Sequence, residues 1–446
     1  MGRIRQGRKL TLHALLLALC AAGPLDAAAP SIAPEPPSRP VVDSPELAKL
    51  GAYPVGVRTL NLVEHDAVDL AAPHKDRHLA VDLWYPAKPV PGAKPETYRA
   101  SLQSEPSAST PPPVSFAIPG LAVRNAPSAP GRYPLVMVSH GRSNATIALS
   151  WLTENLASKG YVVAAIRHED LSRTDPTEAP EMLLRRPLDI AFVTRTLQES
   201  LDREDLINPQ LTALIGYSMG GYGVLTAAGA GLDKQSAAAK IVPGALLDPY
   251  TSGGAQQDAI RVRNLKAVVA IAPWGGSVAM WGTAGMSGIS APLFLIAGDH
   301  DHSVDYGTGA RNILETATGS RRYLLTFLGA GHALGFGPAP AEMRHKVWDV
   351  SWFEDPVWRK ERLIGISLHM ITAFLDRFVK GDESRAAYLD VTVPESSTGR
   401  WPAPAGTPFD ALSPGPPAAT LWKGFQRDYA ENLELLQRAP AAGTPP

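Results

Sequence analysis

Apolar and polar positions alternate in blocks along most of this chain, with short apolar runs separated by longer segments of helical periodicity. The short runs have the length and branched composition of buried strands, and glycine, proline or polar residues bound them. From residue 133 onward the expected strands are 133–139, 161–166, 211–216, 265–272, 292–297 and 323–327. The expected helices are 146–159, 182–203, 218–230, 306–318 and 357–379. Strands that alternate with helices predict an α/β protein with a mostly parallel, doubly wound sheet.

The segment before residue 133 has a different pattern. Two runs, 55–62 and 79–85, alternate apolar and polar residues, which predicts an antiparallel pair at the edge where the sheet begins. Residues 86–131 are dense in proline, serine and alanine without a clear period, which indicates an ordered loop insertion. We therefore expect a single domain over 47–438 that contains this insertion.

The beginning of the chain is typical of an export signal. Four basic residues within the first nine precede an apolar stretch, and small residues follow at 27–29. The apolar stretch is too short to cross a membrane, and no later segment is long enough either. We expect residues 1–29 to be removed and the mature chain to be exported, to the periplasm or outside the cell, without an integral membrane segment. Residues 30–46 are rich in proline and alanine and predict a disordered leader.

Cysteine content and charge narrow the class of protein further. The single cysteine, Cys20, lies inside the signal, so the mature chain would have neither a thiol nor a disulfide. Lipidation of Cys20 is an alternative, but Leu19 is bulky for the residue before the cleaved bond. The formal net charge is −1, which argues against nucleic acid or an acidic surface as a partner.

The pentapeptide Gly-Tyr-Ser-Met-Gly at 216–220 fits the motif G-x-S-x-G. It directly follows the expected strand 211–216 and leads into a small, helix-like segment. This context is the one in which a serine on a sharp strand-to-helix turn exposes its hydroxyl as a nucleophile. Glycines on both sides let the neighbouring backbone pass close to the turn. The sequence therefore predicts that Ser218 is a catalytic nucleophile.

The residues that a serine nucleophile needs follow in the order of an α/β-hydrolase, which is serine, then an acid, then histidine. Asp301 follows the strand at 292–297, and His332 follows the strand at 323–327, between glycine-rich neighbours. The strand at 133–139 ends in His140-Gly141, where the second oxyanion donor of such a site normally lies. We expect the backbone N–H groups of Met219 and Arg142 to form the oxyanion hole. His140 is expected to brace this loop, with a role in proton transfer as the alternative.

Other candidate groups are less specific. The cluster Asp299-His300-Asp301-His302 could suggest a metal site, but no remote set of ligands has metal-site spacing, so we expect no metal and no cofactor. Trp274 and Trp281 lie between the nucleophile and the acid, which favours a place in the substrate pocket over the core. His168 is a candidate for the pocket wall or an ordinary loop histidine. The insertion at 86–131 is expected near the mouth of the site.

From about residue 50 to 435 the chain resembles the secreted α/β-hydrolases grouped with platelet-activating-factor acetylhydrolases and dienelactone hydrolases. The resemblance is carried by Leu-Trp-Tyr-Pro-Ala at 83–87, Ser-His-Gly at 139–141, Gly-Tyr-Ser-Met-Gly-Gly at 216–221, Ala-Pro-Trp at 272–274, Arg-His-Glu-Asp at 167–170 and the pair Asp301 and His332. The block from Ser218 to Trp274 is also similar to the polyester-hydrolysing cutinases. Dienelactone hydrolase has a cysteine nucleophile, whereas this chain has serine.

The resemblance implies the α/β-hydrolase fold and ester chemistry. It also favours Asp301 over Asp299 as the acid, because in the family pattern the strand ends in glycine, here Gly298, and the acid lies a few residues later. We therefore expect a secreted serine carboxylic ester hydrolase that forms an acyl-enzyme. The sequence shows no cationic patch for an acidic group and no long amphipathic lid between 231 and 290. These features predict small-molecule or polymeric substrates that are neutral esters, with short- to medium-chain or aromatic groups.

Two other functions remain open. A peptidase of the prolyl-oligopeptidase type would share the triad, but it normally has an N-terminal propeller, for which the segment before residue 133 has no room. A catalytically silent binding protein on a hydrolase scaffold is the second alternative, and the intact set of Ser218, Asp301 and His332 argues against it.

Overall fold

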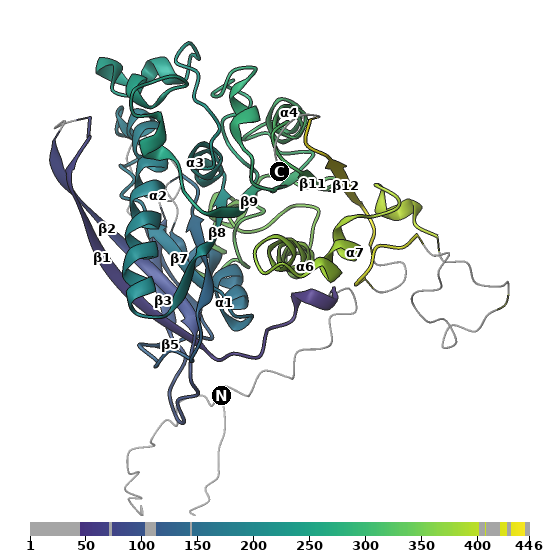
Figure 1. Cartoon of the computed structure of the whole chain (residues 1–446). Coiled ribbons are helices and arrows are strands. Elements are labelled where there is room, and N and C mark those ends of the chain that lie inside the picture. The colour runs from purple at the N-terminus through teal and green to yellow at the C-terminus, as the bar shows by residue number, and fades with distance from the viewer. Residues whose placement is uncertain are drawn as a thin grey trace, which may run out of the picture. The chain divides into compact units, whose positions relative to one another are not determined.

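The computed structural model has a mixed, mostly parallel sheet at its centre (Figure 1). Within the described residues this sheet has ten strands. The strand order is β12-β11-β10-β9-β8-β6-β7-β2-β1-β5. Their bounds are β1 Val55–Ala67, β2 Lys75–Pro86, β5 Val123–Arg124, β6 Tyr133–Ser139, β7 Val162–Arg167, β8 Ile207–Tyr217, β9 Leu265–Ile271, β10 Leu293–Gly298, β11 Arg322–Phe327 and β12 Leu433–Arg438. The structure describes residues 45–70, 74–102, 113–142, 145–400, 406, 420–425 and 430–441.

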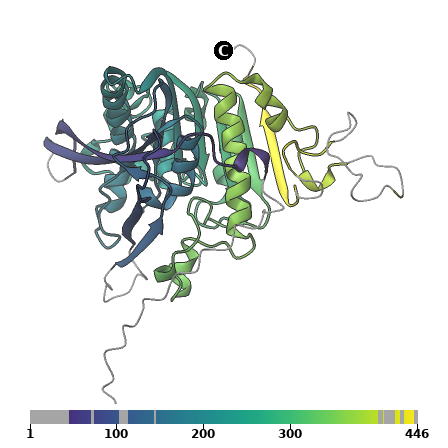
Figure 2. The same cartoon turned by 90° about the horizontal axis from the view of Figure 1, so that it is seen from below.

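The direction of each strand matches the predicted fold class. From β7 to β11 neighbouring strands are parallel, whereas β1 and β2 form an antiparallel pair and β2 pairs with β7 in the antiparallel sense. This is the α/β-hydrolase fold, with the predicted antiparallel N-terminal edge. Figure 2 shows β1 and β12 on opposite sides of the sheet, in purple and yellow. The sequence pattern missed β12, which pairs antiparallel with β11 and covers that edge.

Helices cover both faces of the sheet because successive side chains of a strand point to opposite faces. In β6, Val136 and Val138 belong to one apolar cluster, and Leu135 and Met137 belong to the other. The first cluster includes α1 and α6, and the second includes α2, α3 and α4. The helix bounds are α1 Ser150–Ser158, α2 Glu178–Arg203, α3 Met219–Ala227, α4 Asn312–Thr316, α5 Val347–Ser351, α6 Lys360–Phe378 and α7 Ala386–Leu389.

The insertion at 86–131 contains secondary structure that its composition did not indicate. Two strands, β3 Thr97–Leu102 and β4 Val114–Pro119, form an antiparallel pair. Tyr98 on β3 donates a hydrogen bond of 2.7 Å to the buried Glu154 of α1, and Phe116 on β4 packs on the ring of Phe353. The described part of the insertion therefore packs beside α1 as a structured element.

The predicted signal, most of the predicted leader and Cys20 lie outside the described residues. Within the described residues, we find no helix with both the length and the apolar character needed to cross a membrane.

Candidate active site

The turn between β8 and α3 has the geometry of a nucleophile elbow. Ser218 has φ 53° and ψ −116°, a conformation that costs energy for a residue with a side chain. The flanking glycines are required by close contacts. A Cβ on Gly216 would lie 2.2 Å from the carbonyl oxygen of Gly220, and a Cβ on Gly220 would lie 2.0 Å from that of Ser139. The sharp turn therefore projects the Ser218 side chain from the carboxyl end of the sheet.

Three side chains from three loops meet at this turn. His332 Nε2 lies 3.0 Å from Ser218 Oγ, and His332 Nδ1 lies 2.7 Å from Asp301 Oδ2. Asp301 follows β10 and His332 follows β11, so the parallel strands bring the two loops to one edge of the sheet. These distances allow the imidazole to take a proton from the hydroxyl while the carboxylate holds the opposite ring nitrogen.

The environments of the two candidate acids differ. Asp301 is buried, and its Oδ1 accepts hydrogen bonds from the backbone N–H groups of Ser303, at 2.8 Å, and Val304, at 3.2 Å. Asp299 accepts a hydrogen bond of 2.6 Å from the N–H of Gly329 and contacts His300. Asp301 is therefore the carboxylate oriented toward His332, whereas Asp299 joins the loops that follow β10 and β11.

The residue before the nucleophile holds the histidine loop. The Tyr217 hydroxyl donates a hydrogen bond of 2.9 Å to the carbonyl oxygen of His332, and the two rings lie 5.3 Å apart. Burial raises the pKa of Tyr217, so the hydroxyl remains a donor at neutral pH. The elbow and the histidine loop are thus tied together by a hydrogen bond independent of the one between Ser218 and His332.

The peptide between Gly141 and Arg142 is held in one orientation. The Gly141 carbonyl oxygen accepts a bond of 3.2 Å from Arg186 Nη2 and lies 2.7 Å from His140 Nδ1. Arg186 Nη1 also donates to the carbonyl oxygen of His140, at 2.7 Å. In a trans peptide the C=O and the following N–H point in opposite directions. Holding the Gly141 carbonyl against Arg186 therefore turns the Arg142 N–H away from Arg186.

His140 has the bracing position that the sequence favoured. Its Nε2 accepts a bond of 3.3 Å from the backbone N–H of His168, which leaves Nδ1 as the donor to Gly141. Burial lowers the pKa of His140 to about 3, so the ring is neutral at neutral pH. A buried, neutral histidine with both nitrogens engaged in hydrogen bonds supports the loop.

His168 does not line the cavity, and its prediction as a pocket-wall residue is corrected. The ring is buried between Ser139, 2.9 Å from Nε2, and Asp189, 3.0 Å from Nδ1. Burial lowers its pKa to about 4. Burial alone would raise the pKa of Asp189, but Arg77 holds it below its usual range. His168 thus belongs to a buried polar network between β6 and α2. Its loop position in the sequence did not indicate this.

A cavity of about 800 Å³ opens at Ser218. Trp274 lines it, as the sequence predicted, and Met219, Arg142, His332 and Tyr217 line it as well. Trp281 does not line it, and this prediction is also corrected. The Trp281 ring is buried, donates a hydrogen bond of 3.0 Å to Thr226 Oγ1 and lies beside Tyr222 in the core. None of the described residues of the insertion at 86–131 lines the cavity either, so their expected place at its mouth is not observed.

Several lining residues of this cavity were not predicted from the sequence, and three of them have large side chains that face it. Trp348 and Trp352 come from α5 and its end, and Arg173 comes from the loop between β7 and α2. Trp352 packs on Phe336, which packs on Tyr217. The four-residue spacing of the two tryptophans places them on one side of a helix, and this spacing was the signal available in the sequence.

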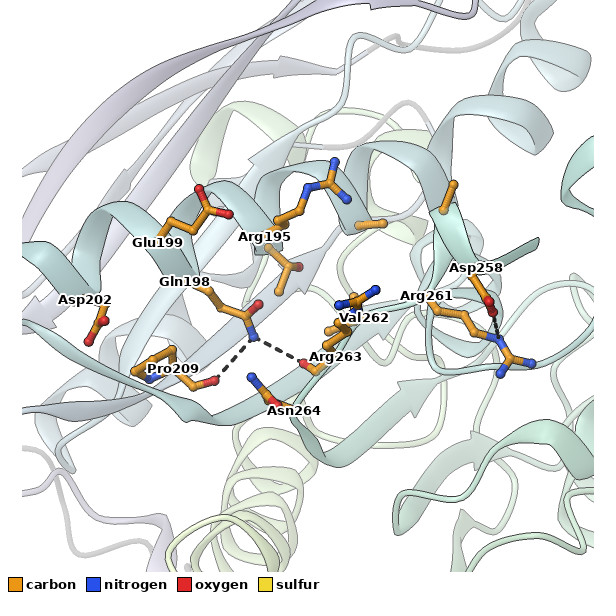
Figure 3. Close-up of a pocket in the computed structure, with 13 residues that line it drawn as sticks. Arg195, Gln198, Glu199, Asp202, Pro209, Asp258, Arg261, Val262, Arg263 and Asn264 are labelled. Carbon is orange, nitrogen blue, oxygen red and sulfur yellow. Dashed lines mark hydrogen bonds and ion pairs between the residues drawn. The ribbon is translucent and has the colours of Figure 1, made fainter. Parts of the chain in front are cut away.

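A second cavity of about 640 Å³ lies between α2 and the segment before β9 (Figure 3). Arg195, Glu199 and Asp202 on α2 line it, and Gln198 donates to the carbonyl oxygens of Pro209 and Arg263. It shares no lining residue with the cavity at Ser218.

Comparison with known proteins gives a partial match to a family model and similarity to solved structures. A family model described as PET hydrolase-like matches residues 123–248, which include Arg142 and Ser218 but neither Asp301 nor His332. No curated protein matches the sequence. Among solved structures, the chain is similar to a ferulic acid esterase from Streptomyces cinnamoneus, with 21% identity and a TM-score of 0.49. This similarity covers 76% of this chain and 94% of the esterase.

Proposed function

We propose that this chain is a serine carboxylic ester hydrolase that works through an acyl-enzyme. The observation that carries the proposal is the continuous contact from Ser218 Oγ through the His332 imidazole to Asp301, at the mouth of a cavity in an α/β-hydrolase fold. The match of residues 123–248 to the PET hydrolase-like model supports the same chemistry.

In the first half of the reaction, His332 Nε2 takes the proton of Ser218 as the oxygen attacks the ester carbonyl. General-base catalysis of this kind contributes roughly 10²–10⁴-fold. Asp301 keeps the Nδ1 proton facing the carboxylate and stabilises the imidazolium that forms. The carbonyl oxygen becomes an oxyanion, and the N–H groups of Met219 and Arg142 donate to it. His332 then gives its proton to the leaving alcohol.

In the second half, water replaces the alcohol. His332 takes a proton from the water, which attacks the acyl carbonyl, and the proton returns to Ser218 as the ester bond to the enzyme breaks. The same oxyanion donors act again. The products are a carboxylic acid and an alcohol, and no residue is consumed.

The walls of the cavity support short- to medium-chain and aromatic esters as substrates. Trp274, Val278, Ile241 and Trp348 give it apolar surface, and Trp348 and Ile241 are 36% and 48% exposed. We also propose that the enzyme is exported, on the strength of the basic and apolar pattern at the beginning of the sequence.

Covalent labelling tests the proposed nucleophile. A fluorophosphonate probe is expected to label the wild-type protein at one site, because the activated hydroxyl attacks phosphorus as it would a carbonyl. Ser218→Ala should abolish labelling, whereas Ser139→Ala, which changes a buried hydroxyl near the site, should leave it. Mass spectrometry locates the label. A wild-type protein that is folded and stays unlabelled would contradict the proposal and favour the silent binding protein.

A chain-length series tests the substrate class. Across p-nitrophenyl esters from acetate to palmitate, kcat/KM is expected to be highest for short to medium chains, because a cavity of about 800 Å³ must also hold the alcohol. Steady-state rates below and above the solubility limit of each ester would show this. A maximum at palmitate with activation at an oil–water interface would contradict it and indicate a lipase.

A further inference from the structure

The loop that carries His332 has little conformational restraint of its own. Glycine occupies positions 329, 331, 335 and 337 of this loop, and Gly329 has φ +81°. Glycine has access to more backbone conformations than any other residue, so a loop rich in it does not fix its own shape. The position of His332 relative to Ser218 is therefore set by contacts from other parts of the chain.

Side chains from outside the loop hold its main chain on both sides of His332. On the preceding residue, the N–H of Gly331 donates a hydrogen bond of 2.7 Å to Asp355 Oδ2. On the following residue, the carbonyl oxygen of Ala333 accepts a hydrogen bond of 2.5 Å from Lys360 Nζ. The peptide groups that flank His332 are thus restrained both before and after it in the chain.

The Asp355 carboxylate is itself held in place. Its Oδ1 accepts hydrogen bonds of 2.9 Å and 2.8 Å from the backbone N–H groups of Val357 and Trp358. The indole N–H of Trp358 donates a hydrogen bond of 2.9 Å to the carbonyl oxygen of Leu328, directly after β11. The carboxylate is therefore fixed within its own segment and, through Trp358, against the beginning of the loop that carries His332.

Lys360 contributes a buried charge to the same loop. It is the first residue of α6 and is only 2% exposed. Burial lowers the pKa of Lys360 to about 8, and the negative charges of Glu354, Asp355 and Glu361 oppose this effect. The ammonium form therefore predominates at neutral pH, and its bond to Ala333 is charge-assisted, which makes it stronger than a bond between neutral groups.

We infer that Asp355 and Lys360 are positioning residues for His332. They hold the peptide groups before and after the histidine, so that its Nε2 stays 3.0 Å from Ser218 Oγ while the ring gains and loses a proton. The Tyr217 hydroxyl holds the carbonyl oxygen of His332 from the side of the elbow. This inference rests on the proposed function and adds two residues to its machinery, neither of which lines the cavity.

Substitution of either residue tests the inference. Asp355→Asn and Lys360→Met are each expected to lower kcat on p-nitrophenyl acetate by roughly 10- to 100-fold, because a shift of about 1 Å at a catalytic group can cost 100-fold. KM should change by less than about threefold, since neither side chain lines the cavity. The rate of fluorophosphonate labelling at Ser218 should fall in parallel with kcat, because it also depends on His332 as the base.

Glu354→Gln and Lys159→Met are the matched controls. Glu354 belongs to the same connection between α5 and α6, but it accepts a hydrogen bond of 2.8 Å from the N–H of Ala339, at the far end of the loop. Lys159 is a half-buried lysine outside the cavity lining, and its Nζ donates to the carbonyl oxygen of Leu47 at 2.6 Å. Both controls should unfold at lower temperature and keep kcat and labelling within about threefold of wild type.

The comparison of variants with a similar loss of stability decides between a positioning and a purely structural role. If kcat and labelling in Asp355→Asn and Lys360→Met stayed within about threefold of the controls, the inference would be overturned and the proposed function would stand. Should Lys360→Met fail to fold, Asp355→Asn decides alone, because it preserves the shape of the side chain. A wild-type protein that is neither labelled nor active on p-nitrophenyl acetate would instead contradict the proposed function.

Discussion

Asp301→Asn is expected to lower kcat by about 10⁴-fold with little change in KM. The amide that replaces the carboxylate would present a donor or a weaker acceptor to His332 Nδ1, now 2.7 Å from Asp301 Oδ2. The ring would then favour the tautomer with its proton on Nε2, which cannot accept the proton of Ser218. Steady-state rates on p-nitrophenyl acetate, with active-site titration of the folded protein, measure the effect.

Asp299→Asn is the matched control for this prediction. Asp299 is two residues before Asp301 in the sequence, and its carboxylate accepts a hydrogen bond from the backbone N–H of Gly329. Its replacement should therefore lower the stability of the fold and change kcat by less than about tenfold. Thermal unfolding separates the two effects. If Asp299→Asn proved the slower of the two purified, folded variants, the acid would be assigned to the wrong residue.

Arg186→Met is expected to lower kcat by roughly 10²–10³-fold, the usual cost of losing one oxyanion donor. Arg186 does not line the cavity at Ser218. It acts as a positioning residue, because its guanidinium binds the carbonyl oxygens of His140 and Gly141 and so orients the N–H of Arg142. An oxyanion contact is used in the transition state, so KM should change little. A boronic acid that forms a tetrahedral adduct should bind more weakly in proportion to the loss of kcat.

Asp170→Asn is the control that separates the role of Arg186 in orienting the Gly141–Arg142 peptide from its contribution to the stability of the fold. Asp170 pairs with Arg186, and loss of a buried ion-pair partner costs several kcal/mol, about 3–5 in comparable proteins. The Arg186 bonds to the two carbonyls would remain, so this variant should unfold at lower temperature while kcat stays within about tenfold of wild type. Equal losses of stability with normal kcat in both variants would show that Arg186 is only structural.

Local patterns account for most of what could be predicted about the fold. The strands of the sheet are short apolar runs whose side chains alternate between two hydrophobic cores. In β6, for example, all residues are buried, and successive side chains belong to different cores. β12 escaped prediction because Leu433–Arg438 mixes apolar and polar residues, as an edge strand with one covered face does. The strands β3 and β4 escaped because their stabilising contacts come from Glu154 and Phe353, far away in sequence.

Errors in the site have the same origin. The local sequence around a histidine after a strand, or around a tryptophan after a glycine-rich motif, does not show whether the side chain faces a cavity or the core. His168 is drawn into the buried network by Asp189 on α2, and Trp281 is held in the core by Thr226 on α3. Trp352 and Arg173 reach the cavity from segments on either side of the motif. The segment of Trp352 has only the four-residue spacing from Trp348 as a signal, and the segment of Arg173 has none.

The sequence by itself determined the α/β-hydrolase class and the candidates Ser218, Asp301 and His332, because strand periodicity and the strand–glycine–serine–glycine turn are local properties of the chain. The tertiary structure decided which carboxylate faces His332, how Arg186 orients the peptide between Gly141 and Arg142, and that Arg173 lies on Trp352 at the cavity wall. Each of these depends on the direction of a side chain across loops that are distant in sequence. Such directions are set by packing and by the partners available to buried polar groups. Neither can be predicted from the residues that are neighbours in sequence.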